Sequence, residues 1–133
     1  MLAIDAERAN DVAVVQCSGR LVRGESVSVL RSAVVSHKDA RVIVLDLTEV
    51  DFVDAGGLGT LVSLHHWCRS RGIQLKLVNP SRFVRDLLAR TKLDCVLEIS
   101  TFADTLAVLG PSDQPGWLAR ACGGHAVRAL HAL

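Results

Sequence analysis

The chain has 133 residues, of which 50% are hydrophobic and 22% are charged, so it is long enough and apolar enough to bury one core. A formal net charge of +1 and an aromatic content of 4% argue against nucleic acid or an anionic membrane surface as a partner. The four cysteines form no C-x-x-C pair and predict reduced, buried thiols in a cytoplasmic protein.

The first half of the chain carries strand, helix and strand patterns in turn. Residues 2–9 and the β-branched run at 12–18 flank the turn signal A-N-D, which predicts a hairpin. Apolar side chains recur at helical spacing over residues 25–37 and predict an amphipathic helix. The near-continuous apolar run at 41–47 is typical of a central strand that is buried on both faces of a sheet.

The second half repeats the alternation of strands and helices. Residues 72–78 alternate like an outer strand, and Asn79-Pro80 predicts the cap of a helix, with a last short strand at 95–99. That helix has a predicted inward stripe of Phe83, Val84, Leu87 and Leu88. The spacing of Thr101 and Asp104 is that of a capping box, which predicts a final short helix ending at Gly110-Pro111.

The element order ββαβαβαβα predicts an α/β fold, in which helices pack on a mixed, largely parallel sheet. We place this domain at residues 1–110. The composition then changes, and residues 111–133 are interpreted as a C-terminal tail with a linker and a short helical segment. No segment reaches the roughly 18 apolar residues of a membrane span, and the acidic N-terminus is unlike a signal peptide.

The stretch VDFVDAGGLGTLV, at residues 50–62, runs from a buried strand directly into a helix. Such a helix start presents free backbone N–H groups at the carboxyl edge of the sheet, where α/β proteins place functional sites. The residues there are small, which allows another surface to approach the backbone closely. They are Asp54, Ala55, Gly56, Gly57 and Gly59.

The helix that follows divides into two predicted faces. The face expected to pack on the sheet consists of Leu58, Leu61, Val62, His65 and Cys68. The face expected to point outward consists of Gly56, Gly59, Thr60, Ser63, His66, Trp67 and Ser70. A platform of small residues beside an outward tryptophan favours protein docking, with the alternative that Trp67 covers a neighbouring helix or the tail.

Three separated motifs resemble the STAS domain, named for sulphate transporters and anti-sigma factor antagonists. They are LDLTEVDFVDAGGLGTLV, GRLVRGESVSVLR at 19–31 and SRFVRDLLARTKLDCVLEI at 81–99, and the resemblance spans residues 4–109. The last two resemble stand-alone bacterial members of the family.

This resemblance implies a non-enzymatic regulator that works by partner switching. In the family, an antagonist binds an anti-sigma factor that is also a serine kinase, and phosphorylation of one serine breaks the complex. That serine aligns with Gly56 here, and Ala55 before it also lacks a hydroxyl, so the switch at this site is lost. We expect a monomer or weak homodimer that needs no cofactor.

The predicted partner surface also draws on the stretch before the first helix. Many antagonists carry an acidic residue at the position that Val22 occupies here. In this chain, the charged residues of the same stretch that are candidates for partner contact are Arg20 and Glu25. The whole predicted surface comprises Asp54, Ala55, Gly56, Gly57, Leu58, Thr60, Ser63, Trp67, Arg20 and Glu25. The basic residues Arg82, Arg85, Arg90 and Lys92 are interpreted as a solvated face.

Other functions have weaker support. His65 and Cys68 are too few for a zinc site, and Asp54, Thr60 and His66 match no catalytic motif. The sequence G-G-L-G lacks the remainder of a phosphate-binding fingerprint, but small-ligand or nucleotide sensing at the helix start stays an alternative. A second alternative is a scaffold subunit in a larger signalling complex. The tail, through Trp117 and Leu118, is a candidate cover for the docking face.

Overall fold

Five strands form one sheet in the order β1-β2-β3-β4-β5 in a computed structural model, which describes residues 2–100. In chain order the elements are β1 (Leu2–Ala9), β2 (Val12–Leu21), α1 (Glu25–Val35), β3 (Val42–Val53), α2 (Ala55–Ser70), β4 (Gln74–Val78), α3 (Arg82–Arg90), a 3₁₀ turn η1 (Leu93–Cys95) and β5 (Glu98–Ser100). β1 is antiparallel to β2, and all later pairs are parallel. The predicted mixed α/β sheet is confirmed, whereas the predicted last helix and the tail lie outside the described residues.

β3 is the central strand, as its composition predicted. Its residues 42–47 are all buried, on both faces of the sheet. The strand continues beyond the predicted end, because its residues 49–53 pair with residues 18–21 of β2. Two register shifts in this pairing mark irregularities, and they interrupt the simple alternation of the two faces.

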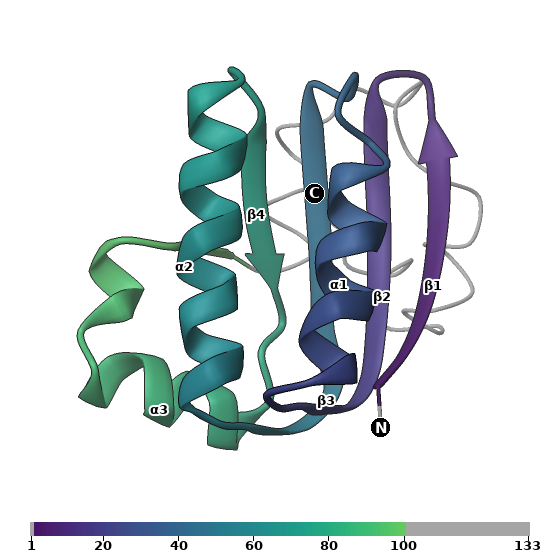
Figure 1. Cartoon of the computed structure of the whole chain (residues 1–133). Helices are drawn as coiled ribbons and strands as arrows, with labels where there is room; N and C mark the ends of the chain where they lie inside the picture. The colour runs from purple at the N-terminus through teal and green to yellow at the C-terminus, as the bar shows by residue number, and fades with distance from the viewer. Residues whose placement is uncertain (1, 101–133) are drawn as a thin grey trace, which may run out of the picture.

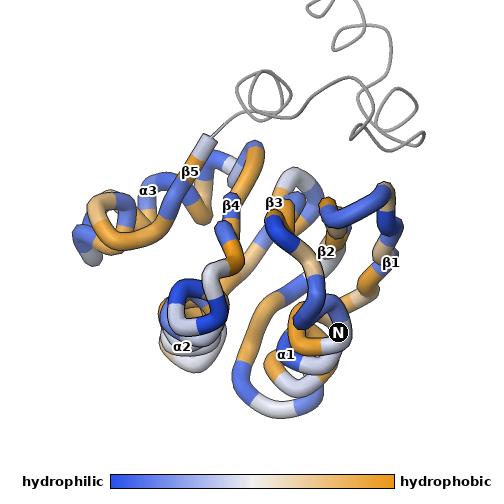
Figure 2. The backbone as a smooth tube through the Cα atoms, turned by 90° about the horizontal axis from the view of Figure 1, so that it is seen from above, coloured by the Kyte–Doolittle hydropathy of each residue, from blue (hydrophilic) through white to orange (hydrophobic). Residues whose placement is uncertain are grey.

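Helices α1 and α2 lie side by side on one face of the sheet, and α3 lies beside β4 (Figure 1, Figure 2). One core cluster joins their buried side chains to one set of strand residues, with Leu30 from α1, Leu61 and Leu64 from α2, and Leu88 from α3. Right-handed parallel connections explain why both helices of this layer return on the same face.

Two details of the α3 region differ from prediction. The helix is capped by Ser81 and not by Asn79-Pro80, because the Ser81 hydroxyl accepts from the Val84 N–H (3.4 Å) and donates to the Val50 carbonyl (2.8 Å). Phe83 is not on the inward stripe, because it is 46% exposed. The rest of the stripe is confirmed: Val84 and Leu88 are buried, and the partly buried Leu87 packs against the core.

The cysteines also divide into two groups. Cys17 and Cys68 are buried free thiols, as predicted, and burial raises the pKa of Cys17 to about 12 and that of Cys68 to about 11. Cys95 was expected to be buried too, but it is exposed, because the predicted strand from Cys95 begins only at Glu98 and Cys95 ends the 3₁₀ turn. Cys122 lies outside the described residues.

Candidate docking edge

The carboxyl ends of β2 and β3 and the first turns of α1 and α2 meet at one edge of the molecule, the lower edge in Figure 1. β3 ends at Val53 and α2 begins at Ala55, so Asp54 alone connects them. Three residues, at positions 22–24, connect β2 to α1. We call this region the docking edge and define it by residues 20–25 and 52–59.

Asp54 joins the two connections of the docking edge. Its Oδ1 accepts the backbone N–H of Gly57 (2.8 Å), which caps α2, and its Oδ2 accepts the backbone N–H of Arg23 (3.1 Å). The backbone N–H of Asp54 donates to the carbonyl of Leu21 (3.2 Å). The N–H donors of Arg23 and then Gly57 hold the pKa of the Asp54 carboxyl below its ordinary value, because they favour the ionised form.

The two adjacent glycines are needed because β2 and the following loop lie against the start of α2. A Cβ at Gly57 would collide with the carbonyl oxygen of Leu21 and would stand 2.9 Å from a methyl group of Val53. A Cβ at Gly56 would stand 2.9 Å from the Cβ of Arg23 and 3.2 Å from its Cα. β2 and the loop after it therefore occupy the space that a side chain at Gly56 or Gly57 would need.

The outward face predicted for α2 is rotated in the structure. Thr60, expected to point outward, is 4% exposed, and its hydroxyl donates to the carbonyl of Gly56 (2.9 Å), which satisfies the buried polar group. Leu64, which the helical wheel missed, is fully buried. Leu58, Val62 and His65 are only half-buried, although Leu58 still packs against the core as predicted. The buried residues of the helix are Gly57, Thr60, Leu61, Leu64 and Cys68.

Two other predicted residues of α2 are only half-buried. Trp67 packs against the core cluster, with the guanidinium carbon of Arg71 4.8 Å from its ring centroid. It lies 12 residues after Ala55, which is roughly 18 Å along a helix axis, so it is far from Asp54. Ser63 lies near α1, where its hydroxyl oxygen is 3.4 Å from both terminal nitrogens of Arg31.

The structure keeps the remaining predicted residues together. Asp54, Ala55, Gly56 and Gly57 form the turn itself, while Arg20 and Glu25 are exposed on either side of the loop that covers Gly56. The basic residues predicted to be solvated, Arg82, Arg85, Arg90 and Lys92, are all exposed.

Sequence reasoning missed an aromatic pair beside this turn. Phe52 is paired in register with Arg20 and is 42% exposed, and its ring stacks on that of Phe83 with centroids 5.5 Å apart. Exposed large hydrophobic side chains are uncommon within residues 2–100, where only Val96 joins these two. The alternation in D-F-V-D places Phe52 opposite the buried Val53, which was the available signal.

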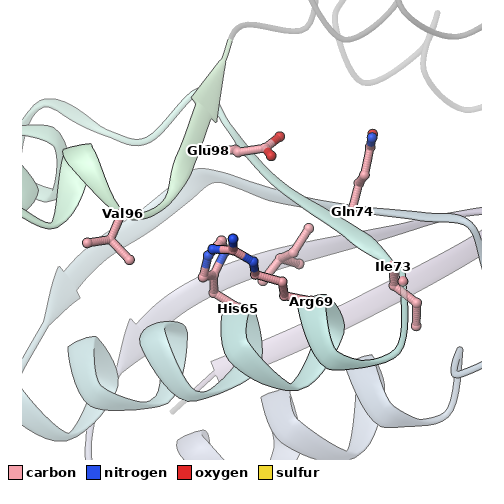
Figure 3. A pocket seen from close by; sticks show the side chains of 8 residues that line it. His65, Arg69, Ile73, Gln74, Val96 and Glu98 are labelled. Atoms are coloured by element: carbon pink, nitrogen blue, oxygen red, sulfur yellow. The ribbon is translucent and has the colours of Figure 1, made fainter.

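A hollow of about 500 Å³ lies elsewhere, between α2, β4 and β5. Figure 3 shows His65 and Arg69 pointing into it from α2, with Val96 and Glu98 on its other side. Glu98 is paired there with Lys76 (2.9 Å). None of the predicted docking residues lines this hollow, and within residues 2–100 no group of three His, Cys, Asp or Glu side chains is placed to hold a metal ion.

A sequence model described as the STAS domain matches residues 3–108. The chain belongs to the STAS domain family. A comparison with curated proteins gave no match. In the part of this STAS protein that the structure describes, no helix is both long and apolar enough to span a membrane.

Several solved structures share the fold of this STAS protein. An anti-sigma factor antagonist from Mycobacterium paratuberculosis is 21% identical, with 81% of this chain and 93% of that chain covered and a TM-score of 0.68. The anti-sigma factor antagonist SpoIIAA, in its unphosphorylated form, is 16% identical, with 80% of this chain and 94% of that chain covered and a TM-score of 0.62. A sulfate transporter family protein from Wolinella succinogenes is 21% identical, with 74% of this chain and 84% of that chain covered and a TM-score of 0.65.

Proposed function

We propose that this STAS protein is a regulatory binding module of the anti-sigma factor antagonist type, which docks an anti-sigma factor with serine-kinase character through the docking edge. The family and the similar antagonist structures support this class of function. The interface would consist of Asp54, Ala55, Gly56, Arg20 and Glu25, extended by Phe52 and Phe83. Exposed aromatic side chains beside small residues are typical of interface hot spots.

The second part of the proposal is that the docking edge keeps a single conformation without phosphorylation. It rests on the contact between Arg23 and Gly56. Glycine has no hydroxyl to accept a phosphate, and a Cβ at this position would stand 2.9 Å from the Cβ of Arg23. Because Asp54 binds the backbone N–H of Arg23, the loop is fixed in this position. Control of the complex would then come from the amount of either protein or from another part of the chain.

Small-ligand sensing at the start of α2 is the weaker candidate. A phosphate binds a helix start through free backbone N–H groups. Here the Gly57 N–H donates to the side chain of Asp54 and the Leu58 N–H donates to its carbonyl (2.9 Å). The negative charge of Asp54 would also repel an anionic ligand.

Affinity capture from an extract of the native cells tests the proposal. We compare the wild type with Gly56→Glu, which introduces bulk and charge at the docking edge, and identify the bound proteins by mass spectrometry. The expected result is a protein with a kinase-type ATP-binding domain on the wild type, lost from Gly56→Glu.

Ser70→Glu is the matched control, because it adds the same charge at an exposed position at the far end of α2. It should retain the partner. Recovery of the same proteins by all three forms would show that the docking edge is not the interface, and the proposal would be wrong. Circular dichroism of the two variants checks that each is folded.

A further inference from the structure

Three polar residues are buried in the described part of the chain, and one of them differs from the others in its hydrogen bonding. They are Ser26, Asp46 and Thr60, each at most 6% exposed. The Thr60 hydroxyl donates to the Gly56 carbonyl (2.9 Å). The Asp46 carboxylate accepts from the N–H and the hydroxyl of Thr48 (3.0 and 2.6 Å). The Ser26 hydroxyl makes no hydrogen bond to any described residue. Because buried polar groups are normally hydrogen-bonded, this hydroxyl calls for a partner that the described fold does not supply.

The Ser26 hydroxyl opens onto a hollow. Every fully enclosed side-chain nitrogen or oxygen atom of the described residues has a hydrogen-bond partner, so the unpartnered hydroxyl is not fully enclosed. Ser26 lines a hollow of about 480 Å³, which lies where β1 begins beside the first turn of α1 (Figure 1, Figure 2). We call this space the α1 hollow and conclude that the hydroxyl faces it.

A short side chain at a core position of α1 leaves room for this hollow. The buried residues of the helix are Ser26, Leu30 and Val34, which follow one another at a spacing of four and share one face. Leu30 and Val34 belong to the core cluster, whereas Ser26 does not. A leucine at position 26 would extend into the space that the serine leaves open, because protein interiors are otherwise closely packed.

The other walls of the α1 hollow are mainly apolar. Leu2 from β1, Val22 from the loop after β2 and Val29 from α1 line it, and Leu2 is buried while the two valines are half-buried. Arg23 and Glu25 line it as well, but both residues are exposed and their charges are opposite. Small-molecule sites typically have volumes of roughly 300 to 1,000 Å³ and apolar walls with few polar groups. The α1 hollow has this size and this lining.

Two other hollows lack this combination. The hollow between α2, β4 and β5 is lined by none of the three buried polar residues. A hollow of about 290 Å³ beside β1 and β2 is lined by Asp46, but that carboxylate already accepts two hydrogen bonds from Thr48. Neither therefore presents a buried polar group that lacks a partner.

We propose that the α1 hollow binds a small neutral molecule with an apolar body and one hydroxyl or carbonyl group. The apolar body lies on Leu2, Val22 and Val29, and the polar group bonds the Ser26 hydroxyl, which can both donate and accept. The inference does not depend on the proposed function, because it rests on the hollow and on Ser26 alone. The hollow adjoins the docking edge through the loop after β2, so the bound molecule lies beside the proposed partner surface.

An NMR titration of the intact, ¹⁵N-labelled chain tests the proposal with two neutral probes, benzyl alcohol and cyclohexanol. We expect saturable shifts of the backbone amide signals of residues 22–29. The amide signals of residues 72–75, which line the hollow beside β4, should stay unchanged. If neither probe causes saturable shifts at residues 22–29, the proposal is wrong.

Two substitutions at one position locate the contact. Ser26→Ala removes the hydroxyl and keeps the apolar walls, so the affinity for benzyl alcohol should fall about threefold to tenfold, while the affinity for toluene stays the same. Ser28→Ala is the matched control, because it makes the same change at an exposed position of α1, and it should change neither affinity. Equal affinities of the wild type and Ser26→Ala for benzyl alcohol would overturn the role of the hydroxyl.

Ser26→Leu should fill the α1 hollow and abolish the binding of both probes, and its amide spectrum shows whether it is folded. Unchanged binding to this folded variant would place the probes elsewhere and contradict the proposal. If neither probe binds the wild type and Ser26→Leu weakens capture of the partner protein, the hollow receives a side chain of that partner. The assignment to a small molecule would then be wrong.

Discussion

The carboxylate of Asp54 accepts the backbone N–H of Arg23 at 3.1 Å and thereby holds the loop after β2 against the start of α2. This bond places the Cβ of Arg23 close to Gly56, where an added Cβ would stand only 2.9 Å from it. The same carboxylate therefore fixes both the connection after β2 and the first turn of α2.

The three glycines of the turn should respond differently to alanine. Gly57→Ala should destabilise the fold by about 3 kcal/mol, because its Cβ meets the Leu21 carbonyl, and Gly56→Ala by about 1 kcal/mol, because Arg23 has to shift. Gly59→Ala should stabilise it by up to about 1 kcal/mol, since nothing lies within 4 Å and alanine favours a helix. Urea unfolding measures all three, and equal effects would contradict this order.

The lowered pKa of Asp54 predicts how the stability of the fold depends on pH. Its pKa is lowered in the folded state, so its contribution to stability is present above the unfolded pKa of about 3.9 and is lost as the pH falls through the folded pKa. Asp54→Asn removes this titration. The difference between the urea midpoints of the wild type and Asp54→Asn should therefore shrink on acidification from neutral pH to about pH 3. A difference that stays constant over this range would disprove the role of the charge.

Thiol reagents should distinguish the cysteines. Cys95 is exposed, whereas Cys17 and Cys68 are buried with pKa values raised to about 12 and about 11. We expect Cys95 to react quickly in the native protein and the two buried thiols only after unfolding. Peptide mapping after brief labelling at pH 8 provides the measurement. Early labelling of Cys68 would mean that α2 opens more easily than its packing indicates.

Phe83→Ala separates stability from partner binding. The ring is 46% exposed and stacks on Phe52, so its loss should cost about 1 to 2 kcal/mol of stability. If the aromatic pair belongs to the interface, affinity for the captured partner should fall by at least about tenfold. Val96→Ala, another exposed apolar side chain, is the control and should leave affinity unchanged. Equal affinities of the wild type and Phe83→Ala for the partner would show that the aromatic pair is not part of the interface.

Local patterns predicted most of the fold because periodicity reports burial directly. The run at 41–47 indicated a central strand, and residues 42–47 are indeed buried on both faces. The wheel of α2 failed because its apolar residues surround the helix, and Thr60 takes a core position by bonding the Gly56 carbonyl. Phe83 was assigned inward as part of an apolar stripe along the helix, but Phe52 supplies a partner for its ring on the surface.

The contact of Arg23 with Gly56 could not be predicted from the sequence, for a different reason. It brings together residues 33 positions apart, and it depends on how far β2 extends beside β3. The pairing of these strands also contains two register shifts, which a local sequence pattern does not predict. The glycine pair identified the place of the site correctly, but only the folded chain explains both glycines.

The central claim is that the docking edge binds its partner in a single, unphosphorylated form. We would measure the affinity of the wild-type protein for the captured kinase-like partner before and after incubation with Mg-ATP, and weigh the intact protein by mass spectrometry. The account predicts an unchanged dissociation constant and an unchanged mass. A gain of one phosphate together with a loss of affinity would contradict it, because the switch would then operate through a residue other than Gly56.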